Sequence, residues 1–247
     1  MGMCARTSVG RSDARLRYLA VAYLKGARKY LSNREISEIV GQPEPAVSRY
    51  ASERILPGYR CACEILERLR SASILERILK SLLEVDEGGV VNVPKIAFDA
   101  AVLRMASVEA YFHFRDLKVD VVMTAAVNGV PLATLVSEVL GARLCVAKRE
   151  MDSGGEYIGV EVPYPPPQPR RVSFYAPKYS IEPGDRVLVV DDLLYSGRTL
   201  WALSRLAESV DSEIVGVFAL IGVGEEWKHM VPDTARRVVV LLEVPRS

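Results

Sequence analysis

The hydrophobic residues near the beginning of the chain recur with the period of an α-helix. Between residues 14 and 31 they fall on one face of a helix, at positions 16, 19, 20, 23, 24, 27 and 31. Ser32 or Asn33 can then cap a second, short helix that carries Glu35 in its first turn. Gly41 is typical of the left-handed residue that ends such a helix. The pattern therefore predicts two consecutive helices.

A third helix is predicted directly after this glycine. It begins near Glu44 and Pro45, because proline is tolerated in a first turn, and it extends to about Arg54. Residues 60–84 carry apolar side chains on one face, which predicts one or two further amphipathic helices. The acidic, glycine-rich stretch at 85–89 interrupts this pattern, and we expect a domain boundary there.

Beyond residue 89 the pattern changes to alternating strands and helices. The apolar runs are short and rich in Val, Leu and Ile, which is typical of strands buried on both faces of a parallel sheet. We predict strands at 90–93, 119–126, 143–147, 186–190, 213–221 and 236–244. We predict helices at 94–112, 131–141 and 199–209. The pattern describes an α/β domain, whose ligands should bind at the carboxyl ends of the strands.

The composition is ordinary for a globular protein, since 49% of the 247 residues are hydrophobic and 26% are charged. No apolar run reaches the roughly 20 residues that span a bilayer, and the N-terminus lacks the apolar core of a signal peptide. We therefore expect a cytoplasmic protein with no membrane partner. The four cysteines do not form paired CxxC units, which argues against a zinc site or a disulfide framework.

Charge is distributed unevenly along the chain, although the net charge is only +1. Residues 1–60 contain 11 Lys and Arg against 5 Asp and Glu, a balance of +6. The remaining residues contain 21 and 26 respectively, a balance of −5. A basic first segment attached to an acidic body suggests that the N-terminal helices face a polyanion.

The N-terminal helices resemble a helix-turn-helix DNA-binding unit over residues 14–57. In that motif a small residue permits close packing, a glycine forms the turn, and a buried aliphatic residue fixes the second helix; Ser37, Gly41 and Val47 match these positions. The second helix would enter the major groove of double-stranded DNA, where an arginine can bind guanine. A helical hairpin that serves only dimer contacts is the alternative. The predicted DNA-binding residues are Glu44, Ala46, Ser48, Arg49, Tyr50 and Arg54.

A second stretch with candidate chemistry is VLVVDDLLYSGRT, at residues 187–199. Its apolar strand leads into two adjacent carboxylates, Asp191 and Asp192, at the expected carboxyl end of the strand. The residues that follow open a helix, whose first backbone amides can bind an anion together with the hydroxyls of Ser196 and Thr199. Two carboxylates do not bind a phosphate, but they accept hydrogen bonds from a sugar diol. A ribose 5-phosphate group presents both of these partners.

Other interpretations of this stretch are less satisfactory. A Walker B strand requires an upstream GxxxxGK[ST] loop, and a dinucleotide-binding fold requires GxGxxG after a strand; the sequence contains neither. A plain solvated strand end does not account for two carboxylates, a glycine and two hydroxyls at this spacing.

The stretch is highly similar to the ribose-phosphate motif of type I phosphoribosyltransferases, which bind 5-phosphoribosyl 1-diphosphate (PRPP). With Tyr195 and Arg198 it especially resembles the pyrimidine-operon attenuator proteins with uracil phosphoribosyltransferase activity. The fused helix-turn-helix instead resembles archaeal transcriptional regulators that carry an orotate phosphoribosyltransferase-like domain. The resemblance implies an α/β, type I phosphoribosyltransferase fold, a mostly parallel twisted sheet with flanking helices, preceded by an all-α helix-turn-helix domain.

This resemblance also assigns domains and ligand-binding residues. It implies a helix-turn-helix domain at 1–58, a helical linker or dimerisation element at 59–88, and a phosphoribosyltransferase-like domain at 89–247. Asp191 and Asp192 would bind the ribose hydroxyls of PRPP, which Mg²⁺ would accompany. The residues implied to bind the 5-phosphate are Leu194, Tyr195, Ser196, Gly197, Arg198 and Thr199.

Two weaker features match the same family. The stretch MTAAVNGVPLA, at 123–133, follows a strand and precedes a helix, as the diphosphate-binding loop of the family does. Lys148 and Arg149 end the next strand and by resemblance contact the diphosphate, often across the interface of a homodimer; a solvated strand end is the alternative. The residues implied to bind the diphosphate are Ala125, Ala126, Val127, Asn128, Gly129, Lys148 and Arg149.

Residues 150–178 occupy the place of the mobile flap that closes over the reaction centre in this family, and Gly154 and Gly155 suit a hinge. The proline-rich stretch at 163–169 is typical of a stiff, extended segment, which could serve as a hairpin tip, a recognition arm or a spacer. No charged pattern typical of catalytic flaps is recognised in this segment. That departure argues against turnover, but it leaves PRPP binding intact.

Two classes of function remain. The first is a transcriptional regulator of nucleotide metabolism whose transferase-like domain senses PRPP or a nucleotide, and the helix-turn-helix favours it. The second is a catalytic phosphoribosyltransferase with an accessory helical domain; the sequence identifies no catalytic residue and no metal ligand of the chain itself. RNA binding, as in the attenuator proteins, is less favoured beside a DNA-type motif. Trp227 could stack on a base or belong to the core, and His229 is expected to be exposed.

Overall fold

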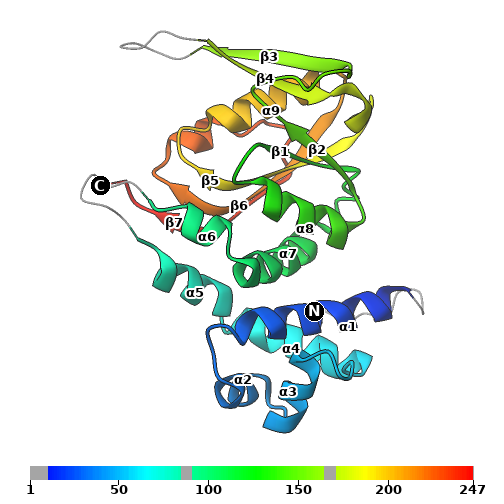
Figure 1. Ribbon diagram of the computed structural model, residues 1–247, viewed down its shortest axis with the longest axis vertical. Coiled ribbons are helices and arrows are strands. Elements are labelled where there is room, and N and C mark those ends of the chain that lie inside the picture. Colours follow the sequence, from blue (N-terminus) through cyan, green and yellow to red (C-terminus); the bar gives the residue numbers. More distant parts are fainter. Residues whose placement is uncertain (1–10, 85–90, 164–170, 247) are drawn as a thin grey trace. The chain divides into compact units, whose positions relative to one another are not determined.

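The structure, a computed structural model, describes residues 11–84, 91–163 and 171–246 of the chain (Figure 1). The chain divides into two compact units. One comprises Met1–Leu83 and Asp99–Glu109, and the other comprises Glu84–Phe98 and Ala110–Ser247. Residues 59–83, which the sequence suggests as a linker, thus cluster with the N-terminal helices, whereas the stretch at 85–89 lies outside the described residues. The expected division after residue 58 stays a prediction.

The first unit is helical. Within the described residues it contains α1 (Arg11–Ala27), α2 (Asn33–Val40), α3 (Glu44–Ala51), α4 (Tyr59–Ser71), α5 (Ile74–Leu82) and most of α7 (Ala100–Phe114). The apolar face of each helix is buried against its neighbours, as the pattern predicts. Residues at the centre of this core include Leu24, Ile36, Val47, Ile65 and Leu79.

The predicted start and end of α2 are confirmed. The hydroxyl of Ser32 accepts a hydrogen bond from the amide of Glu35 (3.2 Å), whose carboxylate accepts one from the amide of Ser32 (2.7 Å). Gly41 ends the helix with a φ of 65°, in the left-handed region. α3 ends at Ala51, three residues earlier than predicted, because Glu53 adopts a φ of 61° that a helix cannot continue through.

The prediction of a single helix at 94–112 is wrong, because the structure has two separate helices there, α6 (Pro94–Ala97) and then α7. The break lies at Asp99. Its Oδ1 accepts hydrogen bonds from the amides of Ala101 (2.9 Å) and Val102 (3.2 Å), so this carboxylate caps the beginning of α7. Aspartate favours such a cap over an interior helical position.

The second unit contains a parallel sheet with the strand order β2-β1-β5-β6-β7 among the described residues. Its strands are β1 (Val121–Ala125), β2 (Arg143–Ala147), β5 (Arg186–Leu194), β6 (Glu213–Val223) and β7 (Arg237–Val244). Figure 1 shows α8 (Val130–Leu140) on one face of the sheet and α9 (Arg198–Glu208) on the other. The short 3₁₀ segments η1 (Lys178–Ser180) and η2 (Glu226–Met230) precede β5 and β7. The predicted parallel sheet with flanking helices is confirmed.

Two predicted strands differ from the structure by more than two residues at an end. β5 extends four residues beyond the predicted end, because it stays paired with β6 as far as Leu194 and Gly222. Asp191 and Asp192 therefore lie within the strand, near its end. The strand predicted at 90–93 is not present in the part of this stretch that is described, where Val91 forms only an isolated bridge.

The segment expected to be a flap forms an antiparallel hairpin of β3 (Tyr157–Pro163) and β4 (Arg171–Pro177). Val162, Phe174 and Ala176 of this hairpin are buried in the same core cluster as apolar residues of α9. The backbone amide and carbonyl of Tyr175 also bond to Lys148, at 2.7 and 2.8 Å. The hairpin is thus part of the core, while residues 164–169 of the proline-rich stretch lie outside the described residues.

Two further expectations concern cysteines and membranes. Cys61 and Cys145 are free, but Cys63 is disulfide-bonded, which departs from the expectation of unpaired cysteines. Among the helices of the described residues, none has both the length and the apolar character needed to cross a membrane.

Candidate functional site

The residues predicted to bind PRPP lie at one edge of the sheet, where β1, β2 and β5 end side by side. β2 lies on one side of β1 and β5 on the other, so the strand order reverses between β1 and β5. In open α/β sheets, ligands bind at such a reversal, outside the carboxyl ends of the strands. The loops that leave these three strands, at 126–129, 148–156 and 195–197, therefore frame the candidate site.

The loop after β1 approaches β5 closely. A Cβ atom on Gly129 would lie 2.5 Å from Oγ1 of Thr124 and 3.0 Å from Oδ1 of Asp191. Both distances are too short for a comfortable Cβ contact, so the packing requires glycine. Ala126 and Val127, joined by a cis peptide bond, form the exposed tip of this loop. The loops that the sequence assigns to diphosphate and to ribose thus meet in the structure.

Asp191 and Asp192 are both buried, with 7% of each residue exposed. The backbone amide of Asp192 donates a hydrogen bond to Oδ1 of Asp191 at 3.0 Å. Burial, together with the adjacent Asp192 carboxylate, raises the pKa of Asp191 well above its usual range. Such a pair favours partners that donate hydrogen bonds or carry positive charge, such as sugar hydroxyls or a hydrated cation.

The loop after β5 turns into the N-terminus of α9 at Gly197, whose φ of 72° lies in the left-handed region. A Cβ atom on Gly197 would lie 2.7 Å from Cβ of Met230 and 3.0 Å from Cα of Trp227. Segment η2 therefore packs directly over this loop. The first amides of α9 have no partner inside the helix, and the half-buried Ser196 and Thr199 lie beside them, so this end of α9 can bind an anion.

The other residues predicted to bind the 5-phosphate differ in what they can offer. Leu194 is the last residue of β5 and is 2% exposed, so only its backbone can contact a ligand. Tyr195 is 44% exposed at the tip of the loop. Arg198 lines a cavity of about 300 Å³ with Val162, Trp201 and Met230.

Lys148 lies beside the loop after β1, because β1 and β2 pair Ala125 with Ala147. Its Nζ is 2.6 Å from Oδ2 of Asp152, and the hydrogen bond to this carboxylate raises the pKa of Lys148. A cavity of about 540 Å³ opens at this place. It is lined by Phe98, Ala126, Val127, Val130, Pro131, Leu144, Val146, Lys148, Asp152, Tyr157, Pro177, Tyr179 and Ser180.

Arg149 does not line this cavity. Its side chain is exposed, and its Cζ lies 5.8 Å from the centroid of the Phe174 ring in β4. The structure therefore brings Ala126, Val127 and Lys148 to one cavity, but Arg149 is directed at the hairpin. Its predicted role toward a diphosphate stays a prediction.

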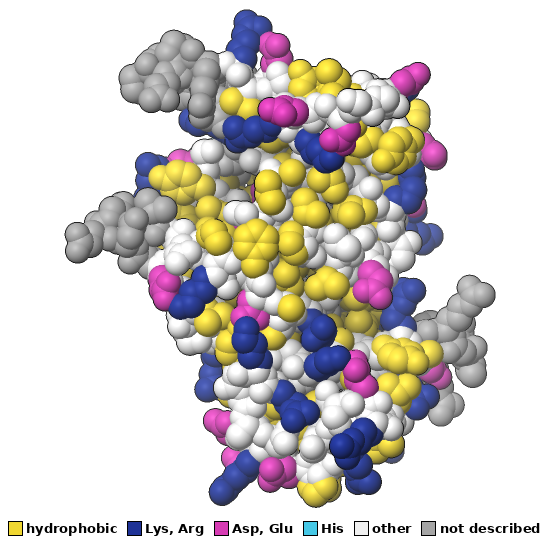
Figure 2. All heavy atoms as spheres, in the orientation of Figure 1, with side chains coloured by type: hydrophobic (Ala, Val, Ile, Leu, Met, Phe, Trp, Pro, Cys, Tyr) yellow, Lys and Arg dark blue, Asp and Glu magenta, His cyan; other side chains and the backbone are white. Residues whose placement is uncertain are grey.

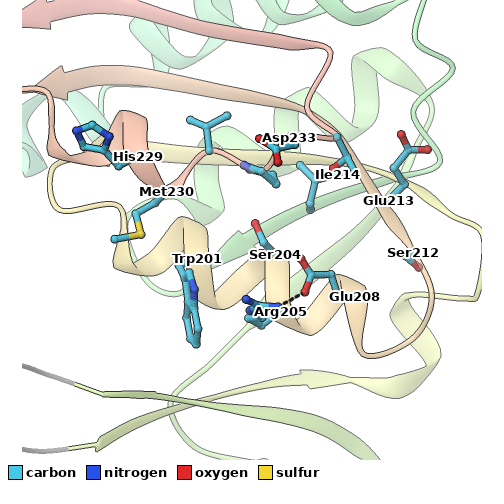
Figure 3. A pocket seen from close by; sticks show the side chains of 13 residues that line it. Trp201, Ser204, Arg205, Glu208, Ser212, Glu213, Ile214, His229, Met230 and Asp233 are labelled. Atoms are coloured by element: carbon cyan, nitrogen blue, oxygen red, sulfur yellow. Dashed lines mark hydrogen bonds and ion pairs between the residues drawn. The ribbon is translucent and has the colours of Figure 1, made fainter.

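A separate cavity of about 530 Å³ lies between α9 and residues 229–234 (Figure 3). Arg205 and Glu208 of α9 pair with each other on one wall, and Asp233 comes from the facing segment. Ile214, at the beginning of β6, also lines it, so the cavity lies toward the amino end of that strand. None of the predicted site residues lines it.

In the helical unit, the two short helices α2 and α3 and the turn between them are compatible with the expected helix-turn-helix. Val47 is fully buried, and the hydroxyl of Ser37 donates to the carbonyl oxygen of Gln42 in the turn (2.6 Å). Lys and Arg side chains are spread over the helices of this unit (Figure 2). Of the residues predicted to bind DNA, Glu44, Arg49 and Arg54 are exposed, whereas Ala46, Ser48 and Tyr50 are half-buried.

Tyr50 and Arg49 differ in their surroundings. The Tyr50 hydroxyl lies 4.0 Å from the sulfur of Cys61 in α4, and burial raises the pKa of Tyr50. Its ring is therefore held against the unit's own helices. Arg49 makes one local hydrogen bond, from Nε to the carbonyl oxygen of Pro45 (3.2 Å), and its guanidinium is exposed.

The sequence pattern missed three residues of this site. Thr124 is fully buried in β1 below Gly129, and its Oγ1 has no hydrogen-bond partner among the described residues. Asp152 pairs with Lys148, and Arg246 contacts Tyr195. Thr124 lies within the stretch at 123–133, but the resemblance gives its hydroxyl no role; Asp152 and Arg246 belong to no short motif, because strand pairing and the return of the chain after β7 bring them to the site. Trp227 is 3% exposed and donates from Nε1 to the carbonyl oxygen of Gly224 (3.1 Å), so it belongs to the core.

This geometry agrees with comparison to known families. The phosphoribosyl transferase domain family matches residues 99–238, which is more than half of the chain, and the chain belongs to this family. Among solved structures, adenine phosphoribosyltransferase from Rhodothermus marinus has a TM-score of 0.61 at 20% identity, covering 69% of this chain and 98% of that chain. The resemblance drawn from the sequence is thereby confirmed for the family and the fold.

The relatives that have names include transcriptional regulators and phosphoribosyltransferases. The chain is 32% identical over 170 residues to the probable purine biosynthesis transcriptional regulator PurR from Streptococcus pneumoniae, covering 68% of this chain and 59% of that protein. It is 32% identical over 133 residues to orotate phosphoribosyltransferase from Thermus thermophilus, covering 53% of this chain and 61% of that protein. The chain thus spans about three fifths of the length of these relatives.

Proposed function

We propose that this chain is a DNA-binding transcriptional regulator of nucleotide metabolism that senses PRPP or a nucleotide through its phosphoribosyltransferase domain. The observation that carries the proposal is the meeting of two loops at one sheet edge, where Gly129 packs against Asp191, in a chain whose helices α2 and α3 are compatible with a helix-turn-helix. The similarity to a protein named as a purine regulator supports it.

The residues at this edge suit the separate parts of PRPP. Asp191 and Asp192 accept hydrogen bonds from the ribose hydroxyls, and the N-terminus of α9 binds the 5-phosphate. The amides of loop 126–129 and the ammonium of Lys148 bind the diphosphate. Mg²⁺ fits this arrangement, because a cation beside the two buried carboxyl groups would favour their ionised form, which burial disfavours; when bound, the ion would neutralise charge on the diphosphate.

The helical unit would act on double-stranded DNA. Arg49 lies exposed on α3, where a recognition helix presents side chains to base edges in the major groove. A homodimer would present two such helices to a partly palindromic site, with one helix for each half-site. The excess of basic residues in the first 60 residues favours a polyanionic partner.

Catalysis of phosphoribosyl transfer is the second candidate function, because the same loops would serve an enzyme and one relative is named orotate phosphoribosyltransferase. Two observations favour sensing. The hairpin in the place of the flap is packed into the core, and the indole of Trp227 is buried and not available to stack on a base.

The decisive experiment titrates the protein with its own upstream DNA, with and without saturating PRPP and Mg²⁺. Ligands that shift a protein between two states typically change the affinity of a second ligand by about 1–3 kcal/mol, or roughly 5–150-fold. We expect a change of this size. Operator DNA should in turn change the affinity for PRPP by the same factor.

Turnover with orotate, uracil and purine bases would be measured in parallel. DNA titrations that superimpose with and without PRPP and nucleoside monophosphates, together with measurable turnover, would favour the enzyme over the sensor. Unchanged DNA binding by a chain that lacks residues 1–58 would contradict the assignment of the helix-turn-helix.

A further inference from the structure

A cluster of side chains joins the loop after β5 to residues that follow β7. The guanidinium carbon of Arg246 lies 5.1 Å from the centroid of the Tyr195 ring, close enough for a cation–π contact. Arg246 also forms an ion pair with Glu226 at the beginning of η2. The hydrogen bond to the Glu226 carboxylate raises the pKa of Arg246, whose guanidinium is charged at all ordinary pH values.

The backbone around Glu226 is shaped for this arrangement. Gly224 has a φ of 66°, and a Cβ atom there would lie 2.5 Å from Oε2 of Glu226, so the turn permits the carboxylate to fold back over it. The amide of Gly224 donates to the carbonyl oxygen of Val244 at 3.0 Å, which places the end of β7 beside this turn. Arg246, two residues further on, therefore reaches both η2 and the loop after β5.

Segment η2 also packs over loop 195–197, the proposed phosphate-binding loop. Met230 and the backbone of Trp227 contact Gly197, the left-handed residue that opens α9. Loop 195–197 is thus in contact at two places, through Gly197 to η2 and through Tyr195 to Arg246. Because Arg246 is paired with η2, these two contacts belong to one connected cluster.

We infer that Arg246 is a positioning residue for the phosphate-binding loop, which it fixes by joining Tyr195 to η2. The inference rests on the proposed function, since it assigns the loop to the 5-phosphate of a ribose ligand. A loop already held in its binding conformation loses less entropy when the anion binds, and the affinity is correspondingly higher. The effect is expected for ligands with a 5-phosphate and not for diphosphate alone, which uses loop 126–129.

A neighbouring ion pair provides a matched control. Lys228 of η2 pairs with Glu225 (2.8 Å) and with Glu243 of β7 (3.1 Å), and so ties η2 to the last strand without involving Arg246. Its interactions do not include Tyr195. Loss of this lysine therefore tests whether any exposed ion pair between η2 and β7 would have the same effect.

The experiment measures the affinity of the full chain for ribose 5-phosphate and for pyrophosphate by calorimetry, in wild type, Arg246→Ala, Arg246→Lys and Lys228→Ala. Arg246→Ala should weaken ribose 5-phosphate binding by about two- to fivefold, the size of an exposed cation–π contact, and leave pyrophosphate binding unchanged. Arg246→Lys should recover part of the loss, and Lys228→Ala should match wild type.

Equal ribose 5-phosphate affinity in wild type and Arg246→Ala would overturn the inference, as would an equal loss for both ligands or a similar loss in Lys228→Ala. These outcomes leave the proposed function in place, because wild type still binds. A wild-type chain that binds neither ligand would overturn the proposed function and this inference together.

Discussion

Replacement of Gly129 by alanine should disturb the candidate site, although it adds only one methyl group. The new Cβ would lie 2.5 Å from Oγ1 of Thr124 and 3.0 Å from Oδ1 of Asp191, whereas ordinary contacts begin at 3.4 Å. Restoring that distance requires a movement of about 0.9 Å by the first oxygen and about 0.4 Å by the second. The φ of Gly129 is −71°, so alanine adds no backbone strain. The whole effect therefore arises from steric overlap of the new methyl group with its neighbours.

The two neighbours differ in how readily they can move. Oγ1 of Thr124 has no hydrogen-bond partner in the described residues, so rotation of this side chain breaks no bond. Oδ1 of Asp191 accepts a hydrogen bond from the amide of Asp192, so displacement of this carboxylate strains that bond. Overpacking of this kind costs about 1–3 kcal/mol. At about 2–4 °C per kcal/mol, the melting temperature should fall by roughly 2–12 °C.

The assay combines thermal unfolding with calorimetric titration of PRPP. Gly129→Ala should lower both the melting temperature and the affinity, because Asp191 no longer lies where the ribose hydroxyls require it. Gly58→Ala is the control, since that glycine has a negative φ of −61° and nothing within 4 Å of its Cβ position. The double variant Thr124→Ala with Gly129→Ala should recover part of the loss. The packing argument would be refuted by a Gly129→Ala protein that has the melting temperature and the PRPP affinity of wild type.

Three other predictions concern the acid pair and α3. Asp191→Asn with Asp192→Asn should abolish most PRPP binding measured by calorimetry, since hydrogen bonds to charged groups contribute roughly 1.5–3 kcal/mol each; unchanged affinity would contradict the site. Arg49→Ala should weaken specific DNA binding by about 1–3 kcal/mol in a salt-controlled titration, whereas Arg60→Ala, on the 94%-exposed arginine of α4, should not. Because the pKa of Asp191 is raised in the folded chain, that chain keeps a proton that the unfolded chain releases above the ordinary carboxyl pKa of about 4. Stability in urea should therefore fall as pH rises from about 4 toward the raised pKa, and Asp191→Asn should remove this part of the fall.

Local signals in the sequence account for much of the fold. The cap at Ser32 and the left-handed Gly41 lie where the pattern places them, because each depends only on residues within one helical turn. The edge that holds Asp191 was predictable for a similar reason. A run of buried residues followed by polar ones places Asp191 near the carboxyl end of its strand, although the strand itself continues to Leu194.

Features set by distant residues could not be predicted in this way. β5 extends to Leu194 because β6 offers it a partner, and α7 begins anew because Asp99 caps it, although helical periodicity continues through both α6 and α7. Arg246 contacts Tyr195, which lies 51 positions earlier in the chain, and no motif links the two residues. Such contacts follow from strand order, which periodicity does not encode.

The packing of the β3–β4 hairpin limits how a ligand can change this protein. Lifting the hairpin would expose Val162, Phe174 and Ala176, and fully burying a large apolar side chain is worth about 1.5–3 kcal/mol. If diphosphate binds at this edge as proposed, it would be accommodated more readily by exchange at Lys148, whose exposed pair with Asp152 is of a kind worth only about 0–1 kcal/mol. Diphosphate would compete for this ammonium and release Asp152, which also accepts a hydrogen bond from Tyr157 at the beginning of β3 (3.3 Å). A signal of occupancy would therefore begin in residues 148–157, beside the hairpin, while the hairpin itself stays in place.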